Sequence, residues 1–384
     1  MILHKKIVYC IPSLHIHGGV ERVISKKASY MADVLGHEVY VIMTDAKDKK
    51  PFFPLSPKVK QIQLDENFEE LWNKPLCKKI YLYEKHLHNY KRKLTQCLME
   101  IKPDITISTL RREINFLCDI KDGSKKIGEM HVNREEFRNL NQDKGANFIK
   151  KAIQFIWTKQ LLSSLRKLDY FVVLTEKDKT KWTELDSEKV VAIPNPLYFY
   201  ADMPEPCQEK RVVAVGRFCY QKGFDMLIDC WKIIVERHPD WRLNIYGDDG
   251  EKIRNYIESR NLSDYISIHG VTSNIQQALS GNSIFVLSSR FEGFGMVITE
   301  AMACGIPAVS FDCHFGPSDI IQDGIDGLLV EAGNIIDLAE KICDLIEHED
   351  KRKQMGQKAY QNIKRFHIDQ IGQKWDNLFD LVLK

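Results

Sequence analysis

Several familiar sequence signals are missing from this chain of 384 residues. Its ten cysteines include no Cys-x-x-Cys pair, so neither a zinc-ligand spacing nor a disulfide framework is present. Cys10, Cys118, Cys230 and Cys343 lie in apolar runs, as reduced and buried cysteines do. No apolar run approaches the roughly eighteen residues of a spanning helix, and the run near the N-terminus stops at Pro12, too early for a signal peptide. We therefore expect a cytoplasmic protein.

Net charge is also nearly absent. Lysine and arginine total 55 and aspartate and glutamate total 53, which gives a formal charge of +2 and no reason to expect a nucleic-acid partner. The glycine-rich segment that begins at His17, HGGVER, lacks the third glycine of the Gly-x-Gly-x-x-Gly fingerprint. This absence disfavours a nicotinamide-dependent dehydrogenase.

What the chain does contain is a regular alternation of β-rich runs and helical patterns, which predicts parallel sheets with helices on both faces. The length suits two domains. A proline-rich pause, with prolines at 194, 196, 204 and 206, separates two such series. We expect strands at 7–11, 38–43, 104–108, 126–130, 170–174 and 190–193, and then at 212–216, 242–247, 265–269, 284–288, 308–311 and 327–330. The predicted domains are 1–196 and 197–365, followed by a C-terminal helical segment at 366–384.

The segment from Phe291 to Gly305, FEGFGMVITEAMACG, carries the clearest chemical signal. Glu292 and Glu300 flank a glycine-rich turn that lies between an expected strand and an expected helix. Glycine leaves the backbone N–H groups uncovered, and the positive end of a helix attracts anions. Two carboxylates beside an anion-binding turn suit a ligand with both hydroxyls and phosphates, such as a sugar nucleotide.

A second signal follows the strand expected at 212–216. Arg217 and Lys222 lie between Gly216 and Gly223, at the carboxyl edge where open α/β sheets bind ligands. An arginine fork and a lysine point charge can together hold a diphosphate. Taken alone, the pair is also compatible with two ordinary surface cations.

Four segments together resemble the retaining glycosyltransferases of the family-4 type. They are the glutamate segment, VGRFCYQKG from Val215, HGGVERV from His17, and GPSDIIQDGIDGLLV from Gly316. The resemblance implies the α/β GT-B fold, with two Rossmann-like, doubly wound domains facing a deep cleft. It also implies that the C-terminal helix returns to the N-terminal domain, although its apolar stripe fits packing on its own domain as well.

The resemblance assigns roles to individual residues. Arg217 and Lys222 would hold the donor diphosphate, Glu292 the donor sugar and Glu300 the ribose. His131, which follows the strand expected at 126–130, would contact the donor sugar, unless it is a structural loop histidine. The remaining substrate-binding candidates are His17, Gly18 and Gly19 in the N-terminal glycine loop, and Phe294, Gly295, Met296 and Val297 through their backbone amides.

The resemblance implies transfer of a sugar from a nucleoside-diphosphate sugar, with UDP favoured, to a glycan or lipid-linked saccharide in cell-surface polysaccharide or glycoconjugate biosynthesis. No divalent metal or other cofactor is expected, since the chain has no Asp-x-Asp motif. Two alternatives stay open: a sugar-nucleotide epimerase on the same fold, and an inactive transferase-like scaffold that only binds partners.

Two basic, aromatic stretches in the first half of the chain raise the question of peripheral membrane contact. They run from Lys78 to Lys93 and from Phe148 to Lys167. In the second stretch helical spacing predicts one apolar face bordered by lysines, made of Ile149, Ile153, Ile156, Trp157, Leu161 and Leu165. A core-packed helix with solvated lysines fits the same pattern.

Overall fold

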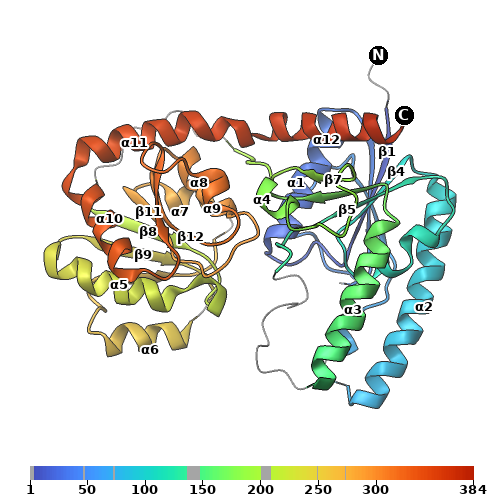
Figure 1. Cartoon of the computed structure of the whole chain (residues 1–384), viewed down its shortest axis with the longest axis horizontal. Helices are drawn as coiled ribbons and strands as arrows, with labels where there is room; N and C mark the ends of the chain where they lie inside the picture. The colour runs from blue at the N-terminus through green and yellow to red at the C-terminus, as the bar shows by residue number, and fades with distance from the viewer. Residues whose placement is uncertain are drawn as a thin grey trace. The chain divides into compact units, whose positions relative to one another are not determined.

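A computed structural model gives the structure of the chain at residues 4–45, 48–71, 74–135, 148–199, 209–248, 250–272 and 274–384. Pro204 and Pro206, used above to argue for a domain boundary, lie outside these residues. The chain forms two compact units (Figure 1). Unit 1 contains residues 1–196 together with the C-terminal residues 368–384, and unit 2 contains residues 197–367.

Unit 1 is built on a parallel sheet that has seven strands among the described residues, in the order β3-β2-β1-β4-β5-β6-β7. Sequential strands run outward in both directions from β1 and β4, so the topological switch point lies between these two strands. The strands are β1 (Lys6–Ile11), β2 (Glu38–Met43), β3 (Lys60–Gln63), β4 (Ile105–Ser108), β5 (Lys125–Glu129), β6 (Tyr170–Val173) and β7 (Val190–Ala192).

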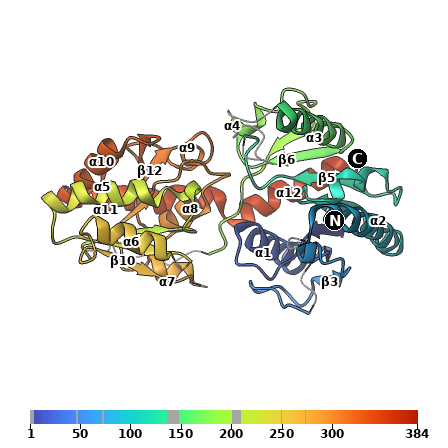
Figure 2. The same cartoon turned by 90° about the horizontal axis from the view of Figure 1, so that it is seen from below.

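Helices cover both faces of this sheet (Figure 2). The helices of unit 1 include α1 (Gly19–Asp33), α2 (Leu76–Ile101), α3 (Phe148–Arg166), α4 (Glu176–Lys179) and α12 (Ile368–Val382). Alternate residues of β1 point to opposite faces: Val8 and Cys10 pack in a cluster with Leu94 of α2, whereas Tyr9 donates a hydrogen bond to the sulfur of Met31 in α1. Helix α12 packs beside α1 on the second face.

Unit 2 repeats the plan with a parallel sheet that has six strands in the described residues, in the order β10-β9-β8-β11-β12-β13. Its switch point lies between β8 and β11. The strands are β8 (Arg211–Val215), β9 (Arg242–Tyr246), β10 (Ile266–His269), β11 (Ile284–Leu287), β12 (Ala308–Asp312) and β13 (Gly327–Glu331). The helices include α5 (Phe224–Arg237), α6 (Glu251–Ser259), α7 (Ile275–Leu279), α8 (Met296–Ala303), α9 (Pro317–Ile320), α10 (Ile335–Glu347) and α11 (Glu349–Asn362).

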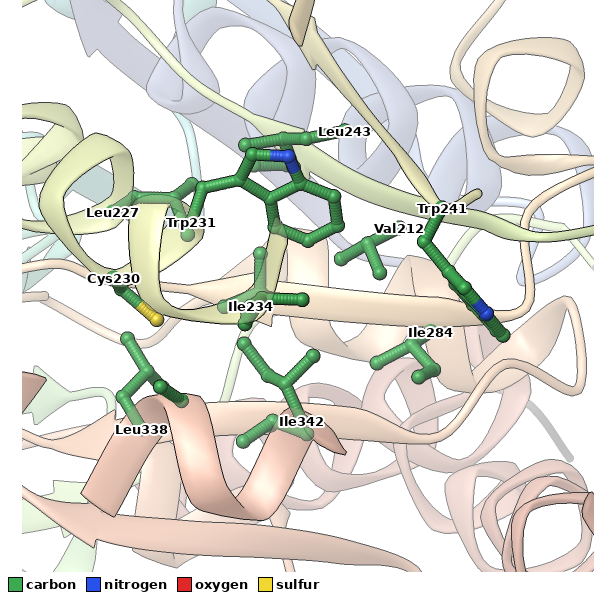
Figure 3. Packing of buried hydrophobic residues seen from close by; sticks show 14 of the residues in the cluster. Val212, Leu227, Cys230, Trp231, Ile234, Trp241, Leu243, Ile284, Leu338 and Ile342 are labelled. Atoms are coloured by element: carbon green, nitrogen blue, oxygen red, sulfur yellow. The ribbon is translucent and has the colours of Figure 1, made fainter. Parts of the chain in front are cut away.

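The core of unit 2 lies between its sheet and helices α5 and α10 (Figure 3). Trp231 of α5 is fully buried beside Leu243 and Val212 of the sheet, and Leu338 and Ile342 of α10 complete the cluster. Burying an aromatic side chain of this size is worth a few kcal/mol, about 3–5 when it is truncated to alanine. The sheet is therefore a rigid base for the loops at its carboxyl edge.

The predicted fold class is confirmed, and each strand expected from the sequence is present to within one residue at each end. Strand β3 was not predicted, because its side chains are exposed or half-buried and show no apolar alternation. Of the two interpretations of the second basic stretch, the core-packed helix holds at Leu161 and Leu165, and the side chains of Ile149 and Ile153 lie outside the described residues. Leu161 and Leu165 are buried in the core of unit 1, since this half of α3 packs against the sheet.

Candidate functional site

The loops that follow β8 and β11 meet at the switch point of unit 2. The hydroxyl of Ser288, just after β11, donates to the backbone carbonyl of Lys222 at 3.0 Å. The backbone N–H of Arg290 donates to the carbonyl of Gln221 at 2.8 Å. These bonds tie the two loops, which are far apart in the sequence, into one structure at the carboxyl edge of the sheet, where ligands bind in this class of fold.

Lys222 and Glu292 form an ion pair at this junction. The Lys222 Nζ lies 2.6 Å from Glu292 Oε1, and the side chains are only 14% and 7% exposed. The Ser289 hydroxyl donates to the same carboxylate oxygen at 2.6 Å. Gly216 makes room for the lysine, since a Cβ at this position would lie 3.1 Å from the Lys222 side chain. A cation and a carboxylate are thus held together, partly shielded from water.

Arg217 opens the loop after β8, and its side chain is exposed. The next residue, Phe218, donates its backbone N–H to the Asp248 carboxylate at 2.6 Å, which fixes the loop to the end of β9. In the part of the chain that the structure describes, Arg217 forms no ion pair, whereas Lys222 is paired. Its guanidinium is therefore available to an anion.

A second ion pair, missed in the sequence, braces the same turn. The Arg290 guanidinium contacts both carboxylate oxygens of Asp225, at 2.9 and 2.5 Å, and lies 4.2 Å from the centre of the Tyr220 ring. Hydrogen bonds from Arg290 hold the pKa of Asp225 below its usual range. Because Asp225 lies in the first turn of α5 and Arg290 follows β11, the pair holds the Lys222 turn against the neighbouring loop. The feature of the sequence that could have identified Arg290 is its position shortly after a buried strand.

Helix α8 starts at the end of the β11 loop. Gly295 precedes it with a φ of 96°, a left-handed conformation that glycine adopts without strain. The first amides of a helix have no partner within the helix, so Met296 and Val297 present N–H groups and the positive end of the helix dipole at this edge. Phe294 differs, because its ring is buried and packs 5.4 Å from Phe366. The Phe294 side chain therefore belongs to the core.

Glu300 lies in the second turn of α8 and is 3% exposed. The rest of that helix, MVITEAMA, is apolar apart from Thr299. A buried carboxylate in such a helix requires polar partners. The loops at the carboxyl edge of this sheet thus carry the Lys222–Glu292 ion pair, Arg217 and the start of α8, the helix that contains Glu300.

The carboxyl edge of unit 1 carries the other predicted residues. Gly18 lies between β1 and α1 and Gly19 is the first residue of α1, next to the switch point. His17 is exposed, and its ring lies 5.8 Å from that of Phe52. His131 follows β5 at the same edge.

His131 is the most unusual residue of this edge. Its side chain is 6% exposed, and both ring nitrogens are buried without a hydrogen-bond partner in the described structure. Burial lowers the pKa of His131 to about 4. The imidazole is therefore neutral at physiological pH, and it can donate through one nitrogen and accept through the other.

Comparison with known proteins identifies the family. Residues 201–362, which make up most of unit 2, match the model of the family described as glycosyl transferases group 1. The chain carries a group 1 glycosyltransferase domain. The predicted family resemblance is thereby confirmed at the level of group 1, and the finer assignment to family 4 stays a prediction. Every site residue of unit 2 described above lies within the group 1 domain.

Two relatives extend the similarity beyond this domain. A poly(ribitol-phosphate) alpha-N-acetylglucosaminyltransferase of Staphylococcus aureus is 32% identical over 262 residues, which are 67% of this chain and 51% of the relative. The chain therefore spans about half of that protein. An uncharacterized glycosyltransferase of Haemophilus influenzae is 25% identical over 382 residues, which are 97% of this chain and 99% of the relative.

Solved structures show the same fold. A crystal structure of a mutant S. aureus TarM in complex with Fondaparinux, alpha-GlcNAc-glycerol and UDP matches with a TM-score of 0.80. The identity is 20%, and the match covers 98% of this chain and 100% of the other. At this identity the likeness establishes the GT-B fold of the chain.

Proposed function

We propose that this protein is a retaining glycosyltransferase that moves a sugar from a nucleoside-diphosphate sugar, UDP-linked, to a hydroxyl of a glycan or lipid-linked saccharide in cell-surface polysaccharide biosynthesis. The observation that carries the proposal is the meeting of Lys222, Glu292 and the start of α8 at the switch point of the group 1 domain. The exposed guanidinium of Arg217 adds a second cation at the same edge.

The proposed chemistry follows from charge. As the bond to the sugar breaks, negative charge develops on the departing diphosphate and positive charge on the sugar. The negative charge on the diphosphate is stabilised by Arg217, Lys222 and the amides of Met296 and Val297. The positive charge on the sugar faces the Glu292 carboxylate. Such preorganised groups usually supply the largest part of catalysis. These cations take the place that a divalent metal would occupy, so the reaction needs no metal.

Two carboxylates divide the recognition of the donor. Glu300, buried in α8, accepts hydrogen bonds from the ribose hydroxyls, and Glu292 accepts from the sugar. In unit 1, neutral His131 hydrogen-bonds a sugar hydroxyl, and the Gly18-Gly19 backbone and His17 contact the substrates. UDP is favoured as the nucleotide because the TarM structure contains it. The name of the S. aureus relative supports a phosphate-containing glycan as acceptor.

We further propose that the protein works at the cytoplasmic face of a membrane, through the N-terminal halves of α2 and α3. Helix α2 has 26 residues and is therefore about 39 Å long, about twice the length of the strands it covers. Both helices follow strands of a parallel sheet, so both begin at its carboxyl edge. Their first turns extend past that edge (Figure 1).

The N-terminal halves of these two helices are apolar and basic. Ile80 and Tyr81 of α2 and Phe155, Ile156 and Trp157 of α3 are each more than half exposed. The sequence of α3 contains four basic residues and no acidic one. Exposed aromatic side chains among cations fit an anionic lipid surface. We call these five residues the overhang surface. Among the described residues, no helix is long and apolar enough to cross a membrane.

Transfer by the purified protein tests the proposed reaction. UDP-glucose, UDP-galactose, UDP-N-acetylglucosamine and GDP-mannose are each incubated with a polyol-phosphate oligomer or with a polyprenyl-pyrophosphate-linked saccharide. We expect transfer from a UDP-sugar, with the anomeric proton of the product showing the coupling constant of the donor configuration. A product of inverted configuration would contradict the proposal.

The same donors without acceptor separate the alternatives. An epimerised nucleotide sugar would support the epimerase, which requires an acid/base pair beside the sugar. Binding of a donor with no turnover on any acceptor would support the inactive scaffold. The intact set of Arg217, Lys222, Glu292 and Glu300 favours the transferase over both.

A further inference from the structure

A fully buried ion pair lies next to His131 in unit 1. Lys27 of α1 donates from its Nζ to Oε1 of Glu129, the last residue of β5. The side chains are 1% and 2% exposed. Burying a lysine and a glutamate costs several kcal/mol for each ion, and such a pair is often no more stabilising than well-packed apolar residues. Stability of the fold alone therefore does not account for the pair.

Aromatic rings complete the environment of the lysine. The Lys27 Nζ lies 3.9 Å from the centre of the Trp375 ring, which comes from α12, and 5.2 Å from that of Tyr9 on β1. Both aromatic faces attract a cation. Burial lowers the pKa of Lys27, while the Glu129 carboxylate opposes that shift. The ammonium group is thus held in a fixed position by three elements of unit 1.

The pair points at His131. The Nε2 of His131 lies 3.6 Å from Glu129 Oε1, slightly beyond hydrogen-bond distance. The second oxygen of Glu129 and both ring nitrogens of His131 are buried without a hydrogen-bond partner in the described structure. Among the described residues, the charged groups that act on the ring are Glu129 from β5, Lys27 from α1 and Arg111 from the loop after β4. Of these three, Glu129 is the one that can accept a hydrogen bond from a ring N–H.

We propose that Lys27 and Glu129 are positioning residues for His131. Lys27 keeps the Glu129 carboxylate ionised and in place, and that carboxylate holds the imidazole proton on Nε2. The Nδ1 lone pair is then free to accept a hydrogen bond from a substrate hydroxyl. Carboxylates commonly fix the tautomer and orientation of functional histidines in this way. The inference rests on the proposed function for the role of His131 toward a sugar.

Lys5 offers a matched control. Like Lys27, it is a buried lysine of unit 1, and it pairs with Asp376 and Asp380 of α12 at 2.6 and 2.8 Å. Both lysines therefore connect the body of unit 1 to α12. Only Lys27 is linked to His131. Lys27→Met and Lys5→Met thus both remove a buried lysine of unit 1. Only Lys27→Met also removes the group linked to His131.

The tautomer of His131 is the direct readout. In protein labelled with ¹⁵N-histidine, the nitrogen chemical shifts of wild type should show the proton on Nε2. Glu129→Gln and Lys27→Met should reduce that population, while Lys5→Met should leave it unchanged. A wild-type ring protonated mainly on Nδ1 would overturn the proposal, and this result requires no variant to fold.

Kinetics separate this proposal from the proposed function. We expect kcat to fall about 10- to 100-fold in Glu129→Gln, the usual cost of losing such a partner, with KM for the donor changed less than threefold. If the tautomer changes but both Glu129→Gln and His131→Asn keep full activity, the pairing stands and the role of His131 fails. If the tautomer does not change while His131→Asn is inactive, the positioning proposal fails and the role of His131 stands.

Discussion

The Lys222 ammonium lies 2.6 Å from the Glu292 carboxylate, within hydrogen-bond distance, at the junction of the two central loops of unit 2. In the proposed function one of these groups binds the diphosphate and the other binds the sugar. Without ligand, each neutralises the other in a partly buried site. A diphosphate must therefore compete with Glu292 for the lysine. For this reason we expect substitution of Glu292 and substitution of Glu300 to change UDP binding in different ways.

Glu292→Gln should reduce transfer without weakening nucleotide binding. The amide keeps the shape of the side chain but removes the charge that faces the sugar and restrains Lys222. We expect kcat to fall at least about 100-fold, the scale of losing one electrostatic stabiliser, while Kd for UDP stays equal or becomes smaller. Calorimetry with UDP and initial rates with the UDP-sugar measure both. Weaker UDP binding would contradict the assigned role.

Glu300→Gln should have the opposite effect on binding. Loss of a charge-assisted hydrogen bond to the ribose costs about 1.5–3 kcal/mol, which raises Kd for UDP by about 10- to 100-fold. We expect the loss to appear with UDP and not with inorganic pyrophosphate, because pyrophosphate has no ribose. Equal losses for both ligands would indicate a general disturbance of α8.

The buried imidazole of His131 should make stability depend on pH. Its pKa is about 4 in the folded protein and near 6.5 in the unfolded chain, so the stabilisation is complete above pH 6.5 and is lost as the pH falls towards 4. His131→Asn lacks this proton linkage. As the pH falls through this range, the free energy of unfolding of wild type should therefore decrease relative to that of His131→Asn, by up to about 1.4 kcal/mol per pH unit. Urea unfolding at several pH values checks this, and a constant difference would contradict it.

Removal of divalent metal should leave the reaction intact. If Arg217, Lys222 and the start of α8 neutralise the diphosphate, initial rates with and without excess EDTA should agree within about twofold. A loss of activity with EDTA that magnesium or manganese restores would show that the cations do not replace a metal.

The overhang surface predicts binding to anionic vesicles. We expect wild type to co-sediment with vesicles containing about a third phosphatidylglycerol and to stay in solution with phosphatidylcholine alone. Ile156→Gln combined with Trp157→Gln should weaken binding at least tenfold. Ile336→Gln is the control, since this side chain is 68% exposed, more than Ile156 or Trp157, but lies on α10 of unit 2. Self-association of wild type without vesicle binding would instead assign the surface to a second copy of the chain.

Local pattern was sufficient to predict the strands and the glutamate segment. Buried parallel strands read as short apolar runs, and SIFVLSS before Glu292 is one of them. Strand β3 shows the limit, because it is largely exposed and has no such run. The glutamates could be found because their loop and helix are continuous in sequence.

Pairs that depend on tertiary structure were not predictable. Asp225 and Arg290 are 65 residues apart, and Lys27 and Glu129 are 102 apart. Periodicity did contain a hint, since Lys27 falls on the apolar stripe of α1 beside Ile24 and Met31. Its partner could not be found without the order of the strands, which brings the end of β5 under α1.

Calorimetric titration of UDP into three proteins tests the central claim most directly. Lys222 follows the carboxyl end of β8, and Lys210 precedes its amino end and pairs with Asp240. Each of the substitutions Lys222→Met and Lys210→Met therefore removes a lysine that is paired with a carboxylate, and the two lysines lie beyond opposite ends of the same strand. We expect UDP to bind wild type and Lys210→Met with the same affinity and Lys222→Met at least about tenfold more weakly, since a charged hydrogen bond is lost. Equal affinity of all three proteins, or no binding of UDP by wild type, would contradict a diphosphate site at this edge.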